Sequence, residues 1–288
     1  VSPLGINVDD GAEYELGADV RHELLSGSGN IFLGSNTLTL GSYGDDISFA
    51  GSIQGDGALT KEGPLTLALT GINTYTGATT ISDGALEISG SLSSETDVVL
   101  GESATYKVLA DDTIASLSGS GAVELGGELN LVGSTPGTPS IFSGSIGGAG
   151  GIRISDAANL TLSGPNTYTG PTRLNGGVIE AADVSALSGT TLISFNGGEL
   201  KVLSDLNLSD EQSVELASQA TIFVGENSKF QIEGDLKDAE SGLSAGFTKI
   251  GSGTLELSGE NTYSGASVVE DGTLQISSLF GLGESFNV

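Results

Sequence analysis

Short runs in which apolar and more polar or smaller residues alternate recur along the whole chain. In "PLTLALTG" (64–71), Leu65, Leu67 and Leu69 occupy every second position, and "GALEISG", "ANLTLSG" and "GTLELSG" repeat the pattern. A period of two sends alternate side chains to opposite faces of a strand, so each run predicts a short strand with one apolar face. Gly, Asn, Asp and Ser separate the runs at short intervals, which is typical of turns.

No convincing helical pattern longer than two turns is present. The nearest candidate is "DLNLSDEQSVELAS" (205–218), in which the spacing of Leu and Val suits strands better. The pattern therefore predicts an all-β protein.

A longer repeat underlies the strands. The phrases "TGINTYTGATTISDGALEIS", "SGPNTYTGPTRLNGGVIEAA" and "SGENTYSGASVVEDGTLQIS" place Asn73, Asn166 and Asn261 at spacings of 93 and 95 residues. Outside the phrase, "YKVLADD" (106–112) returns as "LKVLSDL" (200–206) after 94 residues. The chain thus consists of roughly three units of about 93 residues, approximately 1–100, 101–195 and 196–288.

This self-similarity distinguishes between the all-β folds. A sandwich needs no sequence repeat, and propeller blades usually carry an aromatic or Trp-Asp signature, whereas this chain has no Trp. A parallel β-helix requires repetition because each rung pairs with equivalent strands above and below it. Four rungs of ~23 residues fit one unit, so the chain is predicted to be a single β-helical solenoid of about twelve rungs spanning 1–288.

The repeated phrase predicts one strand, a fixed corner and a second strand. The leucines at 67, 160 and 255 and at 69, 162 and 257, together with Ile81, Leu174, Val269, Leu86, Ile179 and Leu274, are predicted to be core. At the corner, Asn tolerates positive φ and can bond its neighbouring backbone, Gly is the least hindered residue, and Tyr packs its ring while its hydroxyl stays in water. The predicted structural corner residues are Asn73, Tyr75, Gly77, Asn166, Tyr168, Gly170, Asn261, Tyr263 and Gly265.

The phrase resembles the passenger-associated repeat of bacterial autotransporters, the type V secretion family. The resemblance is carried by "GPLTLALTGINTYTGATTISDGALEIS" (63–89) and "KIGSGTLELSGENTYSGASVVEDGTLQIS" (249–277). The middle copy departs more, because "DAANLTLSG" lacks the glycine lead and Arg173 and Asn175 interrupt the following strand. The resemblance implies a right-handed β-helix exported through an outer-membrane β-barrel to the bacterial cell surface. It further implies that the repeats assist folding during export.

For this chain the resemblance favours a non-enzymatic structural or adhesive passenger segment, a rigid stalk. Two alternatives stay open: a β-helical polysaccharide lyase or hydrolase, and the cell-binding region of a secreted toxin. The candidate partners are a host-cell or bacterial-surface receptor or glycan, and a second copy of the chain. Both ends fall within the repeat pattern, and no signal peptide or barrel is recognisable, so the sequence is expected to be a piece of a longer protein whose membrane contact is through the absent barrel.

Charge narrows the range of partners. With 37 acidic residues against 9 Lys plus Arg, the formal net charge is −28, which argues against binding to nucleic acid or anionic lipid. The chain has no Cys, so it has neither disulfides nor thiolate ligands, and no segment reaches the ~18 consecutive apolar residues that span a membrane.

Few residues suggest chemistry, and no catalytic, metal or cofactor residue is predicted. His22 is the only histidine, without a nucleophile motif. Three acidic pairs could cleave glycosides or hold Ca²⁺ but read more readily as solvated turns: Asp9–Asp10, Asp45–Asp46 and Asp111–Asp112. Arg153 and Arg173 could flank a groove in the middle unit.

Overall fold

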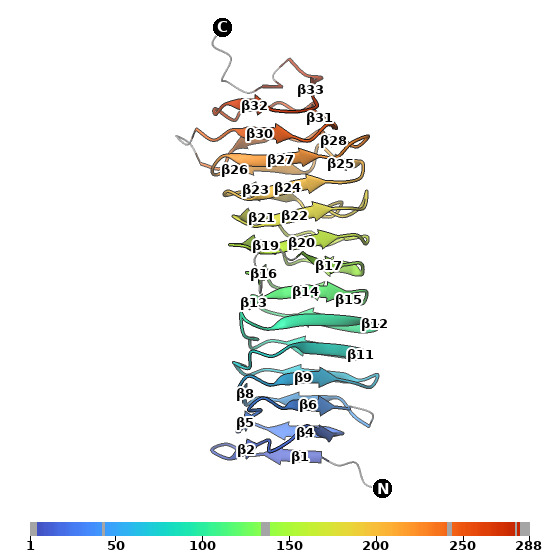
Figure 1. Cartoon of the computed structure of the whole chain (residues 1–288), viewed down its shortest axis with the longest axis vertical. Helices are drawn as coiled ribbons and strands as arrows, with labels where there is room; N and C mark the ends of the chain where they lie inside the picture. Colours follow the sequence, from blue (N-terminus) through green and yellow to red (C-terminus); the bar gives the residue numbers. More distant parts are fainter. Residues whose placement is uncertain (1–4, 42–43, 134–138, 241–243, 280, 283–288) are drawn as a thin grey trace. The chain divides into compact units, whose positions relative to one another are not determined.

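The protein is a solenoid of stacked parallel strands. The computed structural model describes residues 5–41, 44–133, 139–240, 244–279 and 281–282, and within them every regular element is a strand (Figure 1). The strands form about 13 turns, close to the twelve predicted, and the predicted all-β solenoid is confirmed. By contacts the chain divides into two compact units, Val1–Ser134 with Phe142–Gly147, and Thr135–Ile141 with Gly148–Val288. The division into three sequence units stays a prediction.

Unit 1 consists of short strands that pair in parallel with strands one turn away. Two of its strands are longer than the others, β11 with ten residues and β12 with twelve, because each runs through a corner. The strands are β1 Gly5–Val8, β2 Glu13–Glu15, β3 Val20–His22, β4 Leu24–Gly27, β5 Asn30–Phe32, β6 Thr37–Leu40, β7 Ile47–Phe49, β8 Ser52–Gln54, β9 Ala58–Lys61, β10 Thr66–Leu69, β11 Thr79–Ile88, β12 Asp97–Val108, β13 Asp112–Ile114, β14 Ser116–Gly119, β15 Ala122–Leu125 and β16 Leu129–Leu131.

Unit 2 repeats the construction. Its strands are β19 Ile152–Ser155, β20 Asn159–Leu162, β21 Thr172–Asn175, β22 Val178–Ala181, β23 Leu192–Phe195, β24 Glu199–Val202, β25 Leu206–Leu208, β26 Ser213–Leu216, β27 Ala220–Val224, β28 Lys229–Ile232, β29 Leu236–Asp238, β30 Phe247–Ile250, β31 Thr254–Leu257, β32 Ser267–Val269 and β33 Thr273–Ile276. Strands β17 Ser140–Phe142 and β18 Ser145–Gly148 each contain residues of both units.

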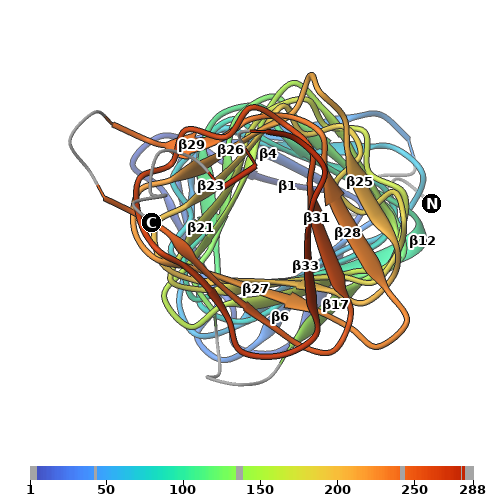
Figure 2. The same ribbon diagram turned by 90° about the horizontal axis from the view of Figure 1, so that it is seen from above.

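Three sheets surround the interior of unit 2. One contains β20, β22, β24, β27, β30 and β32, the second β19, β21, β23, β26 and β29, and the third β25, β28, β31 and β33. Seen from above, β27, β21 with β23, and β28 with β31 lie on three different sides of the interior (Figure 2). Most turns therefore contribute one short strand to each of the first two sides, and the third side has strands only from β25 onward.

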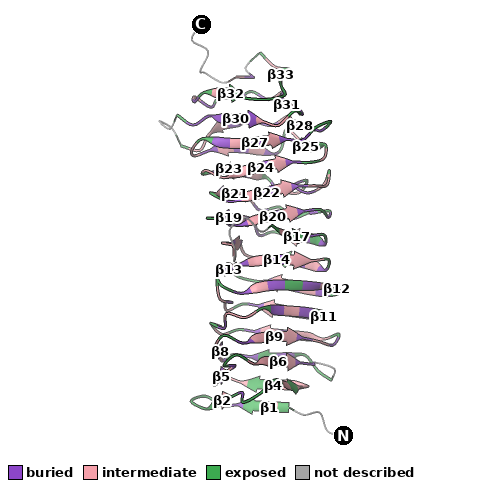
Figure 3. Ribbon diagram, viewed as in Figure 1, coloured by how far each residue is buried: buried purple, intermediate pink, exposed green. Residues whose placement is uncertain are grey.

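The pairing register between strands places apolar side chains of one turn over apolar side chains of the next turn. In unit 1, Leu67 lies opposite Leu86, which lies opposite Tyr106. In unit 2, Leu160 lies opposite Ile179, which lies opposite Leu200. Buried positions alternate with half-buried ones along most strands (Figure 3), so the core is a set of apolar columns inside the turns. Burial of each such side chain stabilises the fold by roughly 1.5–3 kcal/mol.

The predicted core is largely confirmed, with one correction. All six leucines that flank the corners at 67, 69, 160, 162, 255 and 257 are fully buried. Val269 was expected in the core, but 44% of it is exposed, and Leu274 is only half-buried. Within the described residues β32 pairs only with β30, and β33 only with β31, so one edge of each strand has no neighbour to cover it.

Candidate functional site

The three repeated asparagines lie buried at equivalent corners. Asn73 donates from Nδ2 to Gly71 O at 3.1 Å and to Ser91 O at 3.0 Å, while its Oδ1 accepts from Ile53 N at 3.1 Å. Ile53 lies one turn before the corner and Ser91 one turn after it. One amide thus links three successive turns. Asn261 repeats the arrangement, accepting from Leu236 N at 2.9 Å and donating to Gly281 O at 2.9 Å.

The asparagines do not use the positive φ that the sequence-based interpretation allowed them, but they do bond neighbouring backbone as that interpretation expected. The described non-glycine residues with positive φ are Asp156 and Asn227. Asn at the corner is therefore selected by its amide, which has a donor group and an acceptor atom for the backbone of neighbouring turns.

The repeated tyrosines also differ from the prediction. Tyr75, Tyr168 and Tyr263 are fully buried, and their hydroxyls lie 2.6 Å from the side-chain oxygens of Thr79, Thr172 and Ser267. Burial raises the pKa of all three phenols. The hydroxyl is therefore not in water but closes the corner by bonding four residues further along the chain. Ser267 replaces Thr without loss of this bond.

The corner glycines are required by close approach of two turns. A Cβ on Gly77 would lie 2.3 Å from Gly57 O of the preceding turn, and one on Gly170 would lie 2.3 Å from Gly150 O. Real Cβ atoms do not approach a backbone oxygen so closely, so any side chain would push the turns apart. The glycine is thus needed for space between turns rather than for an unusual φ.

A buried lysine precedes two of the three corners by twelve residues, and sequence reasoning missed it. Lys61 is fully buried, and its Nζ donates to Glu62 O (2.9 Å), Gly63 O (2.7 Å) and Asp83 O (3.1 Å). Lys249 makes the equivalent bonds to Ile250, Gly251 and Asp271. Burial lowers the pKa of Lys61 to about 8 and lowers that of Lys249. Ile154 stands at the equivalent place before Asn166.

The acidic pairs singled out in the sequence have structural partners. Asp46 Oδ1 accepts Thr66 N at 2.8 Å, and Asp111 Oδ1 accepts Glu128 N at 2.8 Å. Asp112 is buried, with Tyr106 OH at 2.8 Å and Leu92 N at 3.0 Å, and burial raises its pKa. Each of these carboxylates joins neighbouring turns, which is a structural rather than a catalytic position.

Asp9 has a local partner, because its Oδ1 accepts Asn7 Nδ2 at 2.7 Å. His22 Nε2 lies 3.0 Å from Tyr14 OH, and the two rings contact each other. Arg153 and Arg173 occupy paired positions on β19 and β21, and the groove that they were expected to flank stays a prediction. The described residues hold no group of three or more His, Asp or Glu placed to bind a metal ion.

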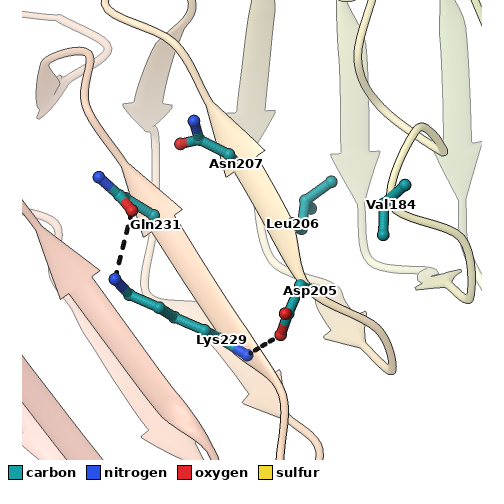
Figure 4. A pocket seen from close by; sticks show the side chains of 6 residues that line it. All are labelled: Val184, Asp205, Leu206, Asn207, Lys229 and Gln231. Carbon is teal, nitrogen blue, oxygen red and sulfur yellow. Dashed lines mark hydrogen bonds between the residues drawn. The ribbon is translucent and has the colours of Figure 1, made fainter.

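A polar groove lies on the outer face of the third sheet of unit 2. One hollow of about 320 Å³ is lined by Val184, Asp205, Leu206, Asn207, Lys229 and Gln231 (Figure 4). A second hollow of about 510 Å³ shares Asp205 and Lys229 with it and is lined further by Asn227, Ser228, Ser252, Gly253, Thr254 and Gln275. These two hollows are called the polar groove below.

Hydrogen bonds hold the side chains of the groove in place. Asp205 Oδ1 accepts Lys229 N at 2.9 Å, and Lys229 Nζ donates to Gln231 Oε1 at 3.3 Å (Figure 4). Lys229 also forms an ion pair with Glu256. Hydrogen bonds to Glu256 from Lys229 and then Ser277 lower the pKa of that carboxyl. The groove therefore contains fixed amides, hydroxyls and an ammonium that is paired with a carboxylate.

Sequence reasoning gave no signal for the groove. Its strands begin at Leu206, which corresponds by the 94-residue spacing to Asp112 of the preceding unit, and Asp112 begins β13 of another sheet. Asp205 matches Asp111 by the same spacing, but the strand that follows it belongs to another sheet, so a search for repeated residues does not find the groove.

Comparison with known proteins finds a described sequence repeat at each of the three corners. A profile described as the passenger-associated-transport-repeat matches residues 59–88, 155–181 and 247–276, each of which contains one Asn-Thr-Tyr corner. The chain is 30% identical over 206 residues to a protein of Brucella suis biovar 1 (strain 1330) named adhesin BmaC autotransporter. The alignment covers 64% of this chain and 6% of that much longer protein. No solved structure matches the chain.

Proposed function

Because this chain belongs to the autotransporter passengers that carry the passenger-associated-transport-repeat, we propose that it is a non-enzymatic, adhesive stalk segment displayed on the bacterial surface. The observation that carries the proposal is the coincidence of the three matched repeats with the three buried corners. Each corner joins successive turns through backbone and side-chain bonds, so the repeats maintain a stacked solenoid rather than a reaction centre.

Stacking also supports a role of the repeats in export. Each turn pairs with the preceding turn, so a newly emerged turn finds a template and buries its leucines as it adds. The corner asparagine bonds backward to the preceding turn and forward to the next one. Such bonds form stepwise as the chain emerges, and they favour addition of turns in order.

The adhesive part of the proposal draws on the printed name of the related Brucella protein. Among the described residues there is no cluster of metal-ligating groups and no helix of the length and hydropathy needed to cross a membrane. The candidate targets are a host-cell or bacterial-surface receptor or a glycan.

Bacteria that display residues 1–288 through an unrelated autotransporter carrier test the proposal. They should adhere to epithelial cells or to bacterial-surface polymers several-fold more than bacteria with the carrier alone. Protease treatment of intact bacteria should remove both the displayed chain and the additional adhesion. Equal adhesion with and without the chain, when antibody staining shows it on the surface, would contradict the adhesive role and leave a purely structural one.

A further inference from the structure

The polar groove differs from the corners of unit 2 in the hydrogen-bonding atoms that its side chains leave without a protein partner. At the corners, amides are buried and bonded to the backbone. In the groove, Asn207 Nδ2 and Gln231 Nε2 both donate to Glu233 Oε1 at 3.1 Å. A carboxylate oxygen only accepts, so the two amide nitrogens must face Glu233 and the orientation of both amides is fixed.

Because the amide nitrogens are held by carboxylates, the oxygen atoms are the groups that remain to bond a ligand. Within the described residues, no protein group bonds Asn207 Oδ1, Asp205 Oδ2 or Gln275 Oε1. Gln275 Nε2 is likewise committed, with Glu256 Oε1 at 3.3 Å. Asn207, Asp205 and Gln275 are exposed and line the groove. The groove therefore presents a row of hydrogen-bond acceptors to solvent, held by the strands behind them.

Acceptors of this kind bind a ligand that donates hydrogen bonds, and charge selects among such ligands. The net charge of −28 disfavours an anion. A cation would meet the ammonium of Lys229 between the two hollows. Lys229 is paired with Glu256, so its ammonium is not free to hold an anion, and the acceptors of the groove favour a neutral ligand with many hydroxyl groups.

The shape agrees with an elongated ligand. The two hollows share Asp205 and Lys229 and are both open to solvent, with volumes of about 320 and 510 Å³. Sites of this volume accommodate ligands of the size of a short oligosaccharide. At one end Val184 is 61% exposed and offers an apolar surface for the C–H face of a sugar ring.

We propose that the polar groove binds a neutral, hydroxyl-rich oligosaccharide, with Asp205, Asn207 and Gln275 accepting hydrogen bonds from its hydroxyls. This inference rests on the proposed adhesive function and assigns the site and ligand class through which adhesion occurs. The binding is reversible recognition and involves no cleavage of the sugar.

The substitution Asp205→Asn tests the site with minimal disturbance. The amide oxygen still accepts Lys229 N, so the NH₂ group replaces the outward oxygen and turns an acceptor into a donor. Asp46→Asn is the matched control, because exposed Asp46 likewise accepts one backbone N–H, from Thr66 at 2.8 Å, and lies outside the groove. Thermal melting of both variants checks that the fold is kept.

Calorimetry on the secreted passenger that contains the chain would use neutral hexasaccharides of glucose, galactose, mannose and N-acetylglucosamine, with heparin and spermine as charged probes. At least one neutral hexasaccharide should bind. Asp205→Asn should weaken that binding about tenfold, a change of about 1.4 kcal/mol in binding free energy, while Asp46→Asn leaves it unchanged.

Two results would overturn the assignment. The first is binding that Asp205→Asn leaves unchanged, and the second is preference for heparin or spermine over every neutral probe. If no probe binds but bacteria displaying the chain still adhere, the glycan site is wrong and the adhesive function stands. If adhesion is also absent, the adhesive function itself fails.

Discussion

Asn166 and Asn207 are the same residue type in the same unit, yet their surroundings are opposite. Asn166 is 1% exposed and donates to Gly164 O at 3.2 Å and Ala186 O at 2.9 Å. Asn207 is exposed, bonds one carboxylate and leaves its oxygen to solvent. The first recurs in each repeat and the second does not. Repetition in this chain therefore reports which residues join turns, whereas Asn207, whose oxygen is available to a ligand, lies outside the repeated phrase.

Replacing each asparagine by alanine should give the largest difference between the two regions. Asn166→Ala leaves two buried backbone carbonyls without a donor, so it should lower the free energy of unfolding by about 2–4 kcal/mol. Asn207→Ala removes an exposed bond and should change it by less than about 0.5 kcal/mol. Urea denaturation of both variants measures the contrast. Similar midpoints would mean that the corner amide does not join the turns.

The sequence predicted one region of this comparison and missed the other for a physical reason. Alternation placed Leu67 and Leu160 in the core because the side-chain period of a strand is local information. The recurrence of Asn73, Tyr75 and Gly77 assigned these residues to one predicted corner. Their interactions were not predicted, because the partners Ile53, Thr79 and Gly57 are set by the stacking distance between turns and by side-chain direction.

The groove was not predictable by the same method. Its residues line two adjoining hollows and come from several separate segments of the chain, only some of which are repeated. The direction of its amides depends on Glu233, and nothing in the sequence places Glu233 beside Asn207. The buried lysines are intermediate in predictability between the corner residues and the groove residues. Lys61 and Lys249 stand twelve residues before a corner, so the repeat contains the signal, but burial of a lysine contradicts its usual exposure.

Replacing a corner glycine by alanine should destabilise the fold by a smaller amount. The experiment distinguishes a glycine needed for close approach of two turns from one needed for its backbone conformation. Gly77→Ala would place a Cβ 2.3 Å from Gly57 O and should destabilise the fold by about 1–3 kcal/mol through overpacking. Gly17 in the same unit has no atom within 4 Å of its ideal Cβ and no positive φ, so Gly17→Ala is the matched control. Thermal melting should show a lower midpoint only for Gly77→Ala. Equal midpoints would refute the spacing requirement at the corner.

The smallest expected effect depends on pH and concerns the buried lysine of the first corner. Burial lowers the pKa of Lys61 to about 8 in the folded chain, below the ordinary lysine value of 10.5. Between these values the unfolded chain binds more protons than the folded chain, so this group adds stability as the pH rises from about 8 toward 10.5. Lys61→Met removes the titration and also the three bonds to carbonyl oxygens.

The advantage of the wild-type chain over Lys61→Met in melting temperature should therefore grow between pH 7.5 and pH 10. Lys107→Met is the control, because Lys107 lies on the surface of the same unit and pairs with Glu124 at 3.7 Å. The difference between wild type and Lys107→Met should stay nearly constant over the same range. A Lys61→Met difference that is constant or shrinks with pH would show that the ammonium is not destabilised by burial. In that case the three carbonyl oxygens, rather than desolvation, would dominate the electrostatics of the corner.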